Sequence, residues 1–281
     1  MDAAVDEQQI ATLLKGVDIP PRPAILVELE KELRKDSPST SELVRLITSD
    51  VALSGHIMQV ANSPAFAGVT PLSSIGQALQ FLGTRPVFSM VVARLLQAAL
   101  DSKLGGGLER FWESSTLTAN LCAEIAERLR CLPVDMAYTF GLFHDCGIPL
   151  LMRRFPQTKS VLMQANAAED GKFTQVEDRL LGTNHAVVGY FLARRWRLPD
   201  DVAQAILHHH DYGILLRSGE VSALTQAQIA VNVLAEHAIR LHVQGENENE
   251  WAKAAAAVCA FLGLSLGGVD DLIEDLRDYI H

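Results

Sequence analysis

The stretch GLFHDCG, residues 141–147, ends an apolar helix-like run with a His-Asp pair and closes it with glycine. Around it the chain shows helical periodicity, and the alternation typical of strands never persists. In RPAILVELEKELRKD, for example, Leu26, Leu29 and Leu33 recur at three- and four-residue spacing, which indicates one apolar helix face. The sequence therefore predicts an all-α, multi-helical protein.

Several expected helices carry their own boundary signals. In SPSTSELVRLI, Ser39 and Glu42 have the spacing of a capping box, in which a hydroxyl and a carboxylate satisfy free amides of the first turn. Ser74 and Gln77 repeat this spacing, and Asp50 is expected to begin the helix between them. Gly83 is the expected C-terminal stop of the helix that follows Ser74.

Three consecutive glycines at residues 105–107 predict a hinge between two helical blocks. We expect the first block to cover residues 1–103 and the second to cover residues 104–281. The second block opens with FWESSTLTANLCAEIAERLRCLP, an amphipathic run that should form a long helix ending before Pro133.

Composition restricts the class of protein. The 281 residues carry a formal net charge of −10, and 48% of them are hydrophobic. An acidic surface repels phosphate backbones, which argues against direct nucleic-acid binding. Four scattered cysteines without C-x-x-C spacing suit a reducing compartment. The first residues lack the pattern of a signal peptide, and the longest apolar run is too short to span a bilayer. We expect a cytoplasmic protein without membrane association.

Five histidine and aspartate positions make the candidate site. They occur in the order His144, Asp145, His185 and, within HHHD, His209 and His210. Imidazoles and carboxylates together suit divalent ions such as Fe, Mn or Zn, and such an ion lowers the pKa of bound water to about 7. A purely structural interpretation remains open, in which the His-Asp pair and nearby backbone groups satisfy one another and tie helix ends together.

Seven stretches carry a resemblance to a known family. They are IPPRPAILVELEKEL, LVRLITSDVALSGHIMQVANSPAF, PLSSIGQALQFLG, FWESS, GLFHDCG, HAVVGYFLARRWRLPDDVAQAILHHH and IAVNVLAEH, in consistent order over residues 19–237. The chain resembles the HDOD domain (HD-related output domain) of bacterial signalling proteins, a divergent branch of the HD superfamily of metal-dependent phosphohydrolases. The resemblance implies an N-terminal helical bundle packed on a C-terminal HD-like helical subdomain.

The resemblance also implies a metal site that is only partly retained. His144 and Asp145 match the HD pair, and His185, His209 and His210 match further ligands of the two-metal HD-GYP branch, which hydrolyses cyclic di-GMP. Three positions depart from the pattern: Ser114 replaces the first histidine, Ile148 the lysine after the HD pair, and Asn232 the distal aspartate. This implies a degraded catalytic site, in which Asp145 is the candidate if any residue is catalytic. No cofactor is required, although Fe, Mn or Zn could still bind.

We therefore expect a non-catalytic regulatory or output module of bacterial signal transduction that acts through ligand- or partner-dependent conformational change. The implied partners are other signalling proteins or a receiver-type domain, with a nucleotide as a possible ligand. One alternative is a metal-dependent phosphohydrolase or phosphodiesterase of HD type. A second alternative is a nucleotide-sensing domain without turnover.

Overall fold

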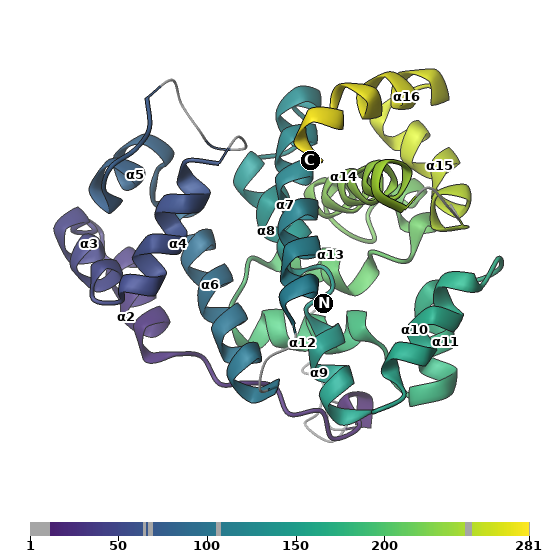
Figure 1. Cartoon of the computed structure of the whole chain (residues 1–281), viewed down its shortest axis with the longest axis horizontal. Helices are drawn as coiled ribbons and strands as arrows, with labels where there is room; N and C mark the ends of the chain where they lie inside the picture. The colour runs from purple at the N-terminus through teal and green to yellow at the C-terminus, as the bar shows by residue number, and fades with distance from the viewer. Residues whose placement is uncertain (1–11, 64–65, 67–69, 105–107, 245–248, 281) are drawn as a thin grey trace. The chain divides into compact units, whose positions relative to one another are not determined.

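The computed structural model describes residues 12–63, 66, 70–104, 108–244 and 249–280 (Figure 1). Within these residues the chain forms helices joined by short turns, and no strand is present apart from an isolated bridge between Ser218 and Val221. The predicted all-α fold is thus confirmed.

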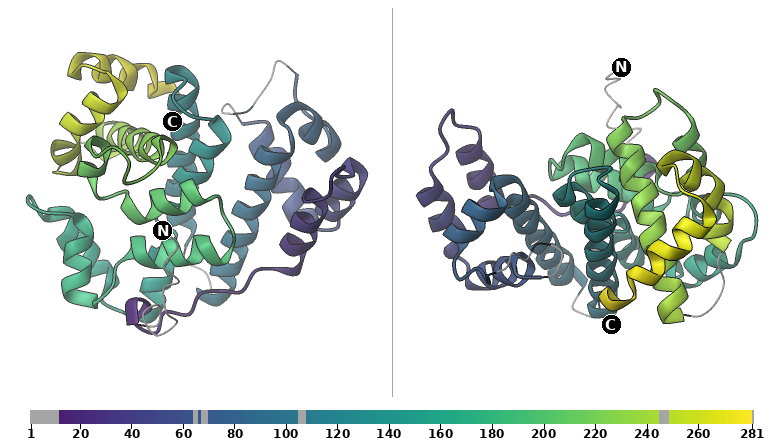
Figure 2. Two further views of the ribbon diagram at one scale, coloured as in Figure 1. Left: turned by 180° about the vertical axis from the view of Figure 1, so that it is seen from behind. Right: turned by 90° about the horizontal axis from the view of Figure 1, so that it is seen from above.

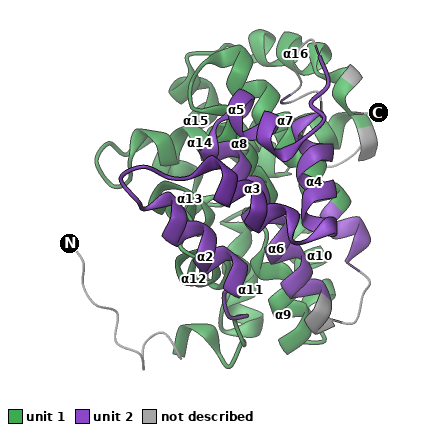
Figure 3. Cartoon of the chain, turned by 90° about the vertical axis from the view of Figure 1, so that its left-hand side faces the viewer, with its two compact units in different colours: residues 1–19, 113–281 green, residues 20–112 purple. Residues whose placement is uncertain are grey.

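The chain divides into two compact units (Figure 3). Unit 1 consists of residues 1–19 and 113–281, and unit 2 of residues 20–112. The division differs from the expected border after residue 103 and from the grouping of residues 1–19 with the first block. Trp112 Nε1 donates to Asp101 Oδ1 at 2.9 Å, which ties the start of α7 (Glu109–Leu129) to unit 2. Arg154 Nε donates to the Lys15 carbonyl at 3.2 Å, which ties the N-terminal segment to unit 1. The glycines at residues 105–107 lie outside the described residues.

Unit 2 contains helices whose starts follow the sequence signals. The Ser39 hydroxyl accepts the Glu42 N–H at 3.3 Å, and the Asp50 carboxylate accepts the Leu53 N–H at 3.0 Å. The expected reciprocal bond from Glu42 to the Ser39 backbone is replaced by one from the Ser39 N–H to Glu32 Oε1 at 2.9 Å. The helices are α2 (Ala24–Leu33), α3 (Thr40–Thr48), α4 (Val51–Ala61), α5 (Ile75–Leu82) and α6 (Thr84–Leu104).

The N-terminal cap of α5 likewise involves two neighbouring residues, Ser73 and Ser74. The Ser74 hydroxyl accepts the Gln77 N–H at 3.2 Å, while Gln77 Oε1 accepts the N–H of Ser73, one residue earlier than expected. Gly83 ends α5 with φ 89°, a backbone conformation that glycine adopts without strain. The predicted boundaries of this helix are confirmed.

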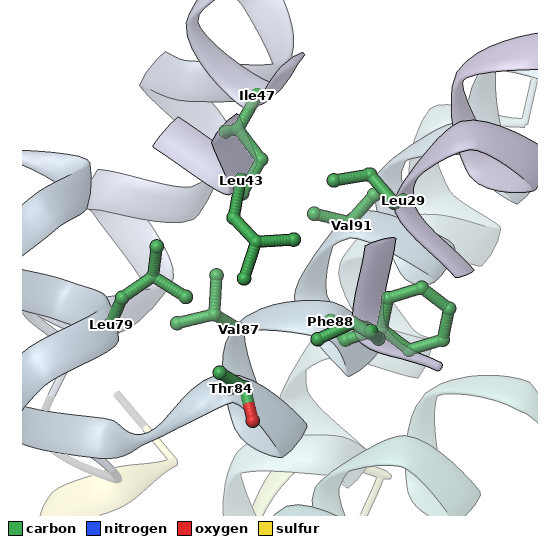
Figure 4. A pocket seen from close by; sticks show the side chains of 9 residues that line it. Leu29, Leu43, Ile47, Leu79, Thr84, Val87, Phe88 and Val91 are labelled. Carbon is green, nitrogen blue, oxygen red and sulfur yellow. The ribbon is translucent and has the colours of Figure 1, made fainter. Parts of the chain in front are cut away.

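An apolar core holds unit 2 together. Leu26, Ile57 and Met90 are completely buried. Between α2, α3, α5 and α6 the side chains leave a hollow of about 10 Å³ (Figure 4). That volume is about one water-sized probe, so the hollow has no room for an organic ligand. It is lined by Leu29, Leu33, Leu43, Ile47, Leu79, Thr84, Val87, Phe88 and Val91.

Unit 1 is built from most of α7 and the helices that follow it (Figures 1 and 2). Within it, α12 packs against α9 and α13, and α14 packs against α8, α13 and α15. The elements are α7 (Glu109–Leu129), α8 (Val134–Phe143), α9 (Gly147–Arg154), α10 (Thr158–Ala167), α11 (Phe173–Leu181), α12 (His185–Arg195), α13 (Asp200–His208), η1 (Tyr212–Leu216), α14 (Ala223–Ile239), η2 (Arg240–Gln244), α15 (Asn249–Leu262), α16 (Leu266–Asp275) and η3 (Arg277–Tyr279).

Of the helices in the described residues, none alone is long and apolar enough to cross a bilayer. One pair, Asn249–Leu262 with Leu266–Asp275, meets the criterion by length and composition when taken together, with a bend of 94° between the two helices.

Candidate metal centre

The expected site residues gather where helix ends of unit 1 converge. His144 is the C-cap of α8, and Asp145 follows it before α9 begins. His185 is the first residue of α12, whose start is fixed by the Asn184 side chain accepting the Val187 N–H at 2.8 Å. His209 is the C-cap of α13.

Two glycines allow these helix ends to approach closely. A Cβ added to Gly147 would lie 2.1 Å from the His185 carbonyl oxygen and 2.8 Å from the Gly189 amide nitrogen. A Cβ on Gly189 would lie 2.9 Å from Ile206 Cγ2 of α13. Because both positions lack a side chain, the backbones of α9 and α12 touch, and Asp145 is brought beside His185.

The outer ring nitrogen of each of three histidines is held by an acceptor. His144 Nδ1 donates to the Gly141 carbonyl and His209 Nδ1 to the Ile206 carbonyl, each at 2.7 Å. A carbonyl oxygen can only accept, so both Nδ1 atoms carry hydrogen. His185 Nδ1 lies 2.5 Å from Oε2 of the buried Glu177. Such outer-shell partners fix the orientation of an imidazole that binds a metal through its other nitrogen.

The inner nitrogens converge on Asp145. His185 Nε2 and His209 Nε2 lie 3.1 Å from each other and 3.3 Å and 3.6 Å from Asp145 Oδ1. His144 Nε2 lies 3.3 Å from the second oxygen, Asp145 Oδ2, and 3.1 Å from Glu236 Oε1. One carboxylate therefore has a different set of imidazoles on each of its two oxygens.

His210 completes the cluster from the edge. Ligand atoms of Asp145, His185, His209 and His210 all lie within 4.8 Å of one another. The His210 ring stacks on Phe173 with centroids 4.6 Å apart, and its Nδ1 lies 3.4 Å from Glu250 Oε2.

Glu250 is itself held by two donors. The Tyr212 hydroxyl donates to Glu250 Oε2 at 2.5 Å, and Lys253 Nζ donates to Oε1 at 2.8 Å. Although burial opposes its charge, the contacts with His210 and Lys253 lower the pKa of Glu250 to about 2. A fixed carboxylate is thus kept ionised behind His210.

Two opposing effects act on the charges of Asp145 and His144: burial disfavours both charges, and ion pairing favours them. Burial opposes a charge on His144, but the Asp145 and Glu236 carboxylates outweigh it and raise the pKa of His144 well above its usual value. Burial likewise opposes ionisation of Asp145, yet the imidazole of His144 outweighs it and holds the pKa of Asp145 well below its usual value. These contacts favour the ionised form of both groups.

The pKa values of His185, His209 and His210 do not all shift in the same direction. Burial opposes a charge on His185, but Glu177 outweighs it and raises the His185 pKa. Burial lowers the pKa of His209, and burial together with the neighbouring His209 lowers the pKa of His210 to about 3. A proton on His185 Nε2 can then bridge to the lone pair of His209 Nε2.

This donor set fits a divalent metal ion. Because His185 and His209 both have their Nδ1 atoms turned to acceptors, their facing Nε2 lone pairs repel unless a proton or a cation lies between them. Imidazole nitrogens and a carboxylate oxygen suit Fe, Mn or Zn. The side chain of Asp145 is 28% exposed, so the cluster is accessible from solvent on the carboxylate side.

The three positions expected to have lost their function lie in different settings. Ser114 is exposed on α7, whereas the next residue, Ser115, is buried, so the side chain of Ser114 does not face the buried cluster. Ile148 is half-buried in α9 and donates its N–H to the Asp145 carbonyl at 2.9 Å. Asn232 is buried in α14, where its Oδ1 accepts from the Cys122 thiol at 3.7 Å.

Three carboxylates near the histidines were missed by the sequence reasoning: Glu177, Glu236 and Glu250. Glu236 lies one helical turn after Asn232 within IAVNVLAEH, so the four-residue spacing could have indicated a carboxylate on the same helix face. Glu177 in the charged run VEDRLL and Glu250 in the polar run ENENE offered no signal, because both runs are typical of solvated surface.

Known proteins share this arrangement of helices. The sequence model of the HDOD domain family matches residues 19–212. An uncharacterized protein of Treponema pallidum (strain Nichols) is 26% identical over 200 residues, which are 69% of this chain and 38% of that protein. The chain thus spans well under half the length of this relative.

Two solved structures cover nearly the whole chain. An HDOD domain protein of unknown function from Geobacter sulfurreducens superposes with a TM-score of 0.64 at 26% identity, over 98% of this chain and 95% of that one. A protein of Shewanella amazonensis SB2B, provisionally described as a phosphohydrolase, has a TM-score of 0.69 at 22% identity, over 96% and 95%.

A third solved structure is longer than this chain. A Marinobacter aquaeolei VT8 protein, provisionally described as a signal transduction protein, has a TM-score of 0.70 at 20% identity, over 99% of this chain and 64% of that one. At these identities, the Shewanella and Marinobacter structures show a common fold.

Proposed function

The chain belongs to the HDOD domain family, and from this premise we propose that it is a non-catalytic regulatory module of bacterial signal transduction whose cluster binds a divalent metal ion. The observation that carries the proposal is the clustering of ligand atoms of Asp145, His185, His209 and His210 within 4.8 Å of one another. Its regulatory partners would be other signalling proteins or a receiver-type domain.

The chain's own residues account for binding without turnover. Asp145, His185, His209 and His210 would hold an Fe, Mn or Zn ion, which supplies Lewis acidity and lowers the pKa of bound water when present. Hydrolysis of a phosphoester also needs a water aimed at phosphorus and groups that stabilise the charge on the phosphoryl oxygens. Ile148 offers no such group where the family pattern has a lysine, and Asn232 is a neutral amide.

Binding at the cluster would act on the fold because its residues come from separate helices. Asp145 lies in the turn between α8 and α9, His185 begins α12, and His209 is the C-cap of α13. An ion shared among these groups would hold the helix ends at one spacing, and its loss would let them separate. The conformational output would arise from this difference between the occupied and empty cluster.

The enzymatic alternative is favoured by one specific observation. Side-chain exposures of 28% for Asp145 and 23% for Glu236 give solvent, and hence a small substrate, access to the cluster. Under this alternative the same ligands would support a metal-dependent phosphohydrolase or phosphodiesterase, and Asp145 would be essential for turnover.

A groove elsewhere in unit 1 gives little support to nucleotide sensing. Its volume is about 290 Å³, and no charged side chain is among the residues that line it. A nucleotide phosphate would therefore meet no cationic partner there. The lining residues are Leu129, Cys131, Ala223, Leu224, Ala227, Phe261 and Leu262.

Metal content and turnover test the proposal together. Protein purified without chelator should carry Fe, Mn or Zn by mass spectrometry, and an Asp145→Ala variant should not. The same preparations, reconstituted with Mn²⁺, should show no hydrolysis of cyclic di-GMP or a generic phosphodiester. Hydrolysis with kcat of about 1 s⁻¹ or more, lost in Asp145→Ala, would establish the enzymatic alternative instead. Protein that stays metal-free after reconstitution would leave the His-Asp pair a structural feature.

A further inference from the structure

We propose that Glu250 positions His210 for the bound ion and thereby couples occupancy of the metal cluster to the docking of α15. The inference rests on the proposed metal binding and concerns the regulation of that site, because it names the helix on which a bound ion acts. Glu250 lies outside residues 19–212, the part of the chain that the family model matches.

The contact between Glu250 and His210 leaves one ring nitrogen for an ion. Glu250 Oε2 lies 3.4 Å from His210 Nδ1. The two nitrogens of an imidazole lie on different edges of the ring, so a carboxylate at Nδ1 leaves Nε2 as the nitrogen available to a metal. Phe173 stacks on the face of the same ring. His210 is thus held both by an edge and by a face.

The same carboxylate fixes the start of α15. Glu250 is the second residue of that helix, and its Oε2 accepts from the Tyr212 hydroxyl of η1 at 2.5 Å. Lys253 donates to Glu250 Oε1 and to the carbonyl of Ala168, the C-cap of α10, each at 2.8 Å. The group that faces His210 therefore also links α15 to η1 and, through Lys253, to α10.

The other contacts of α15 leave its first turn sensitive to this carboxylate. Beyond Glu250, its buried side chains include those of Ala254 and Ala257, and a single methyl group contributes little to burial. Trp251 is half-buried, and its ring stacks on His237 with centroids 4.2 Å apart. Removing the Glu250 charge should therefore loosen the first turn without unfolding the helix.

The coupling works in both directions. An ion bound by His210 holds the ring in the orientation that Glu250 favours, and a docked α15 holds the same ring ready for the ion. By linkage, metal binding strengthens the docking of α15 by the same factor by which docking strengthens metal binding. A purely structural role predicts a different result, because Glu250 would then serve Tyr212 and Lys253 alone and its loss would leave metal affinity unchanged.

Calorimetric Mn²⁺ titration of the full chain separates the two roles. Glu250→Gln keeps the side-chain shape and can still accept from Tyr212, but it loses the charge that faces His210. We expect it to bind Mn²⁺ at least about tenfold more weakly than wild type. Glu274→Gln is the matched control, because Glu274 is an exposed glutamate paired with Arg277, and it should bind Mn²⁺ as wild type does. Unchanged affinity in folded Glu250→Gln overturns the proposal.

Hydrogen exchange followed by mass spectrometry tests the effect on α15. In wild type, Mn²⁺ should slow amide exchange in α15 by at least about fivefold more than in α16, which supplies none of the four proposed ligands. This excess should shrink in Glu250→Gln. Equal slowing of both helices in wild type overturns the coupling even where Mn²⁺ binds.

A second variant covers the case in which Glu250→Gln does not fold, as judged by its circular dichroism melting curve. Glu250→Asp keeps the charge and sets the carboxylate back from His210 by one methylene, so Mn²⁺ binding should still weaken. Unchanged affinity of this variant overturns the proposal and leaves the metal site itself intact. If wild type binds no Mn²⁺, the proposed metal binding fails and this inference fails with it.

Discussion

The cores of the two units differ in kind. In the described part of unit 2 the buried side chains are almost all apolar, and Glu32 is the one buried residue with a charge. Unit 1 buries His144, His185, His209 and Glu177 within its core. Burying polar groups costs free energy unless each finds partners, whereas aliphatic side chains gain from burial without any.

The buried charges of the two units also differ in how they are satisfied. Glu32 is satisfied by groups close to it in sequence: Lys35, just after α2, and the N–H of Ser39, the N-cap of α3. In unit 1, Glu177 pairs across helices with His185, and its other oxygen, Oε1, is buried without a hydrogen-bond partner. An apolar replacement would pack at lower cost, so the polar core is better explained by a binding role than by folding.

The largest expected loss of stability comes from a substitution in the apolar core of unit 2. Leu26→Ala removes a completely buried side chain of α2 and should destabilise unit 2 by about 2–5 kcal/mol through lost burial and a cavity. Urea denaturation followed by circular dichroism measures the loss. Mn²⁺ binding to the folded variant should be unchanged. Loss of Mn²⁺ binding by the folded variant would contradict the expectation that the metal cluster of unit 1 does not depend on the apolar core of unit 2.

Glycine substitutions should have opposite signs in the two units. Gly147→Ala places a Cβ 2.1 Å from the His185 carbonyl, where only backbone can yield, and should cost about 3 kcal/mol. Gly55→Ala in α4 has no atom within 4 Å of the new Cβ and should stabilise by roughly 0.5–1 kcal/mol. Thermal melting of both variants provides the comparison. Similar melting temperatures would show that the α9–α12 approach is not tight in solution.

Glu177→Gln tests whether the buried carboxylate serves the histidine cluster. The amide oxygen can still accept from His185 Nδ1, so the fold should lose only about 1–2 kcal/mol, but the charge that supports the imidazole is gone. We expect Mn²⁺ affinity to fall by about 10–100-fold in calorimetric titration. Unchanged affinity together with a large loss of stability would assign Glu177 a structural role.

The smallest effect concerns His56 in unit 2. Burial, aided by Arg94, lowers the pKa of His56 to about 4, below its unfolded value of about 6.5. The unfolded chain then binds more protons between these pH values, so stability is full above pH 6.5 and is lost as pH falls toward 4. Because His56 is only half-buried, we expect roughly 1 kcal/mol. His56→Gln should lose less in urea midpoint between pH 7 and pH 4.5 than wild type does.

Local signals predicted the local structure well. The caps at Ser39, Asp50 and Ser74 and the stop at Gly83 depend on residues within one turn, and the helices begin or end where these signals place them. The all-α class follows from the same periodicity. The division into units was harder to predict, because it depends on contacts such as that of Arg154 with Lys15, which are far apart in the chain.

The order of residues in the sequence singled out the candidate site residues, but it did not indicate the carboxylates that surround them. His185 and His209 stand out because several histidines follow one another in a known order, and the structure brings their Nε2 atoms to 3.1 Å. Two of the supporting carboxylates, Glu177 of α11 and Glu250 of α15, lie in polar runs that are typical of solvated surface. Only the three-dimensional approach of these helices shows that Glu177 and Glu250 turn inward.

The interruption of unit 1 by unit 2 has a consequence for synthesis on the ribosome. Residues 20–112 form a compact unit that is complete before most of unit 1 exists. The contact of Lys15 with Arg154 must wait until the later residue has left the ribosome. At roughly 5–20 residues per second, translation of the intervening chain takes on the order of ten seconds. During that interval the N-terminal segment has no native partner on α9, so nascent-chain pulse proteolysis should find unit 2 protected while this segment is still cleaved.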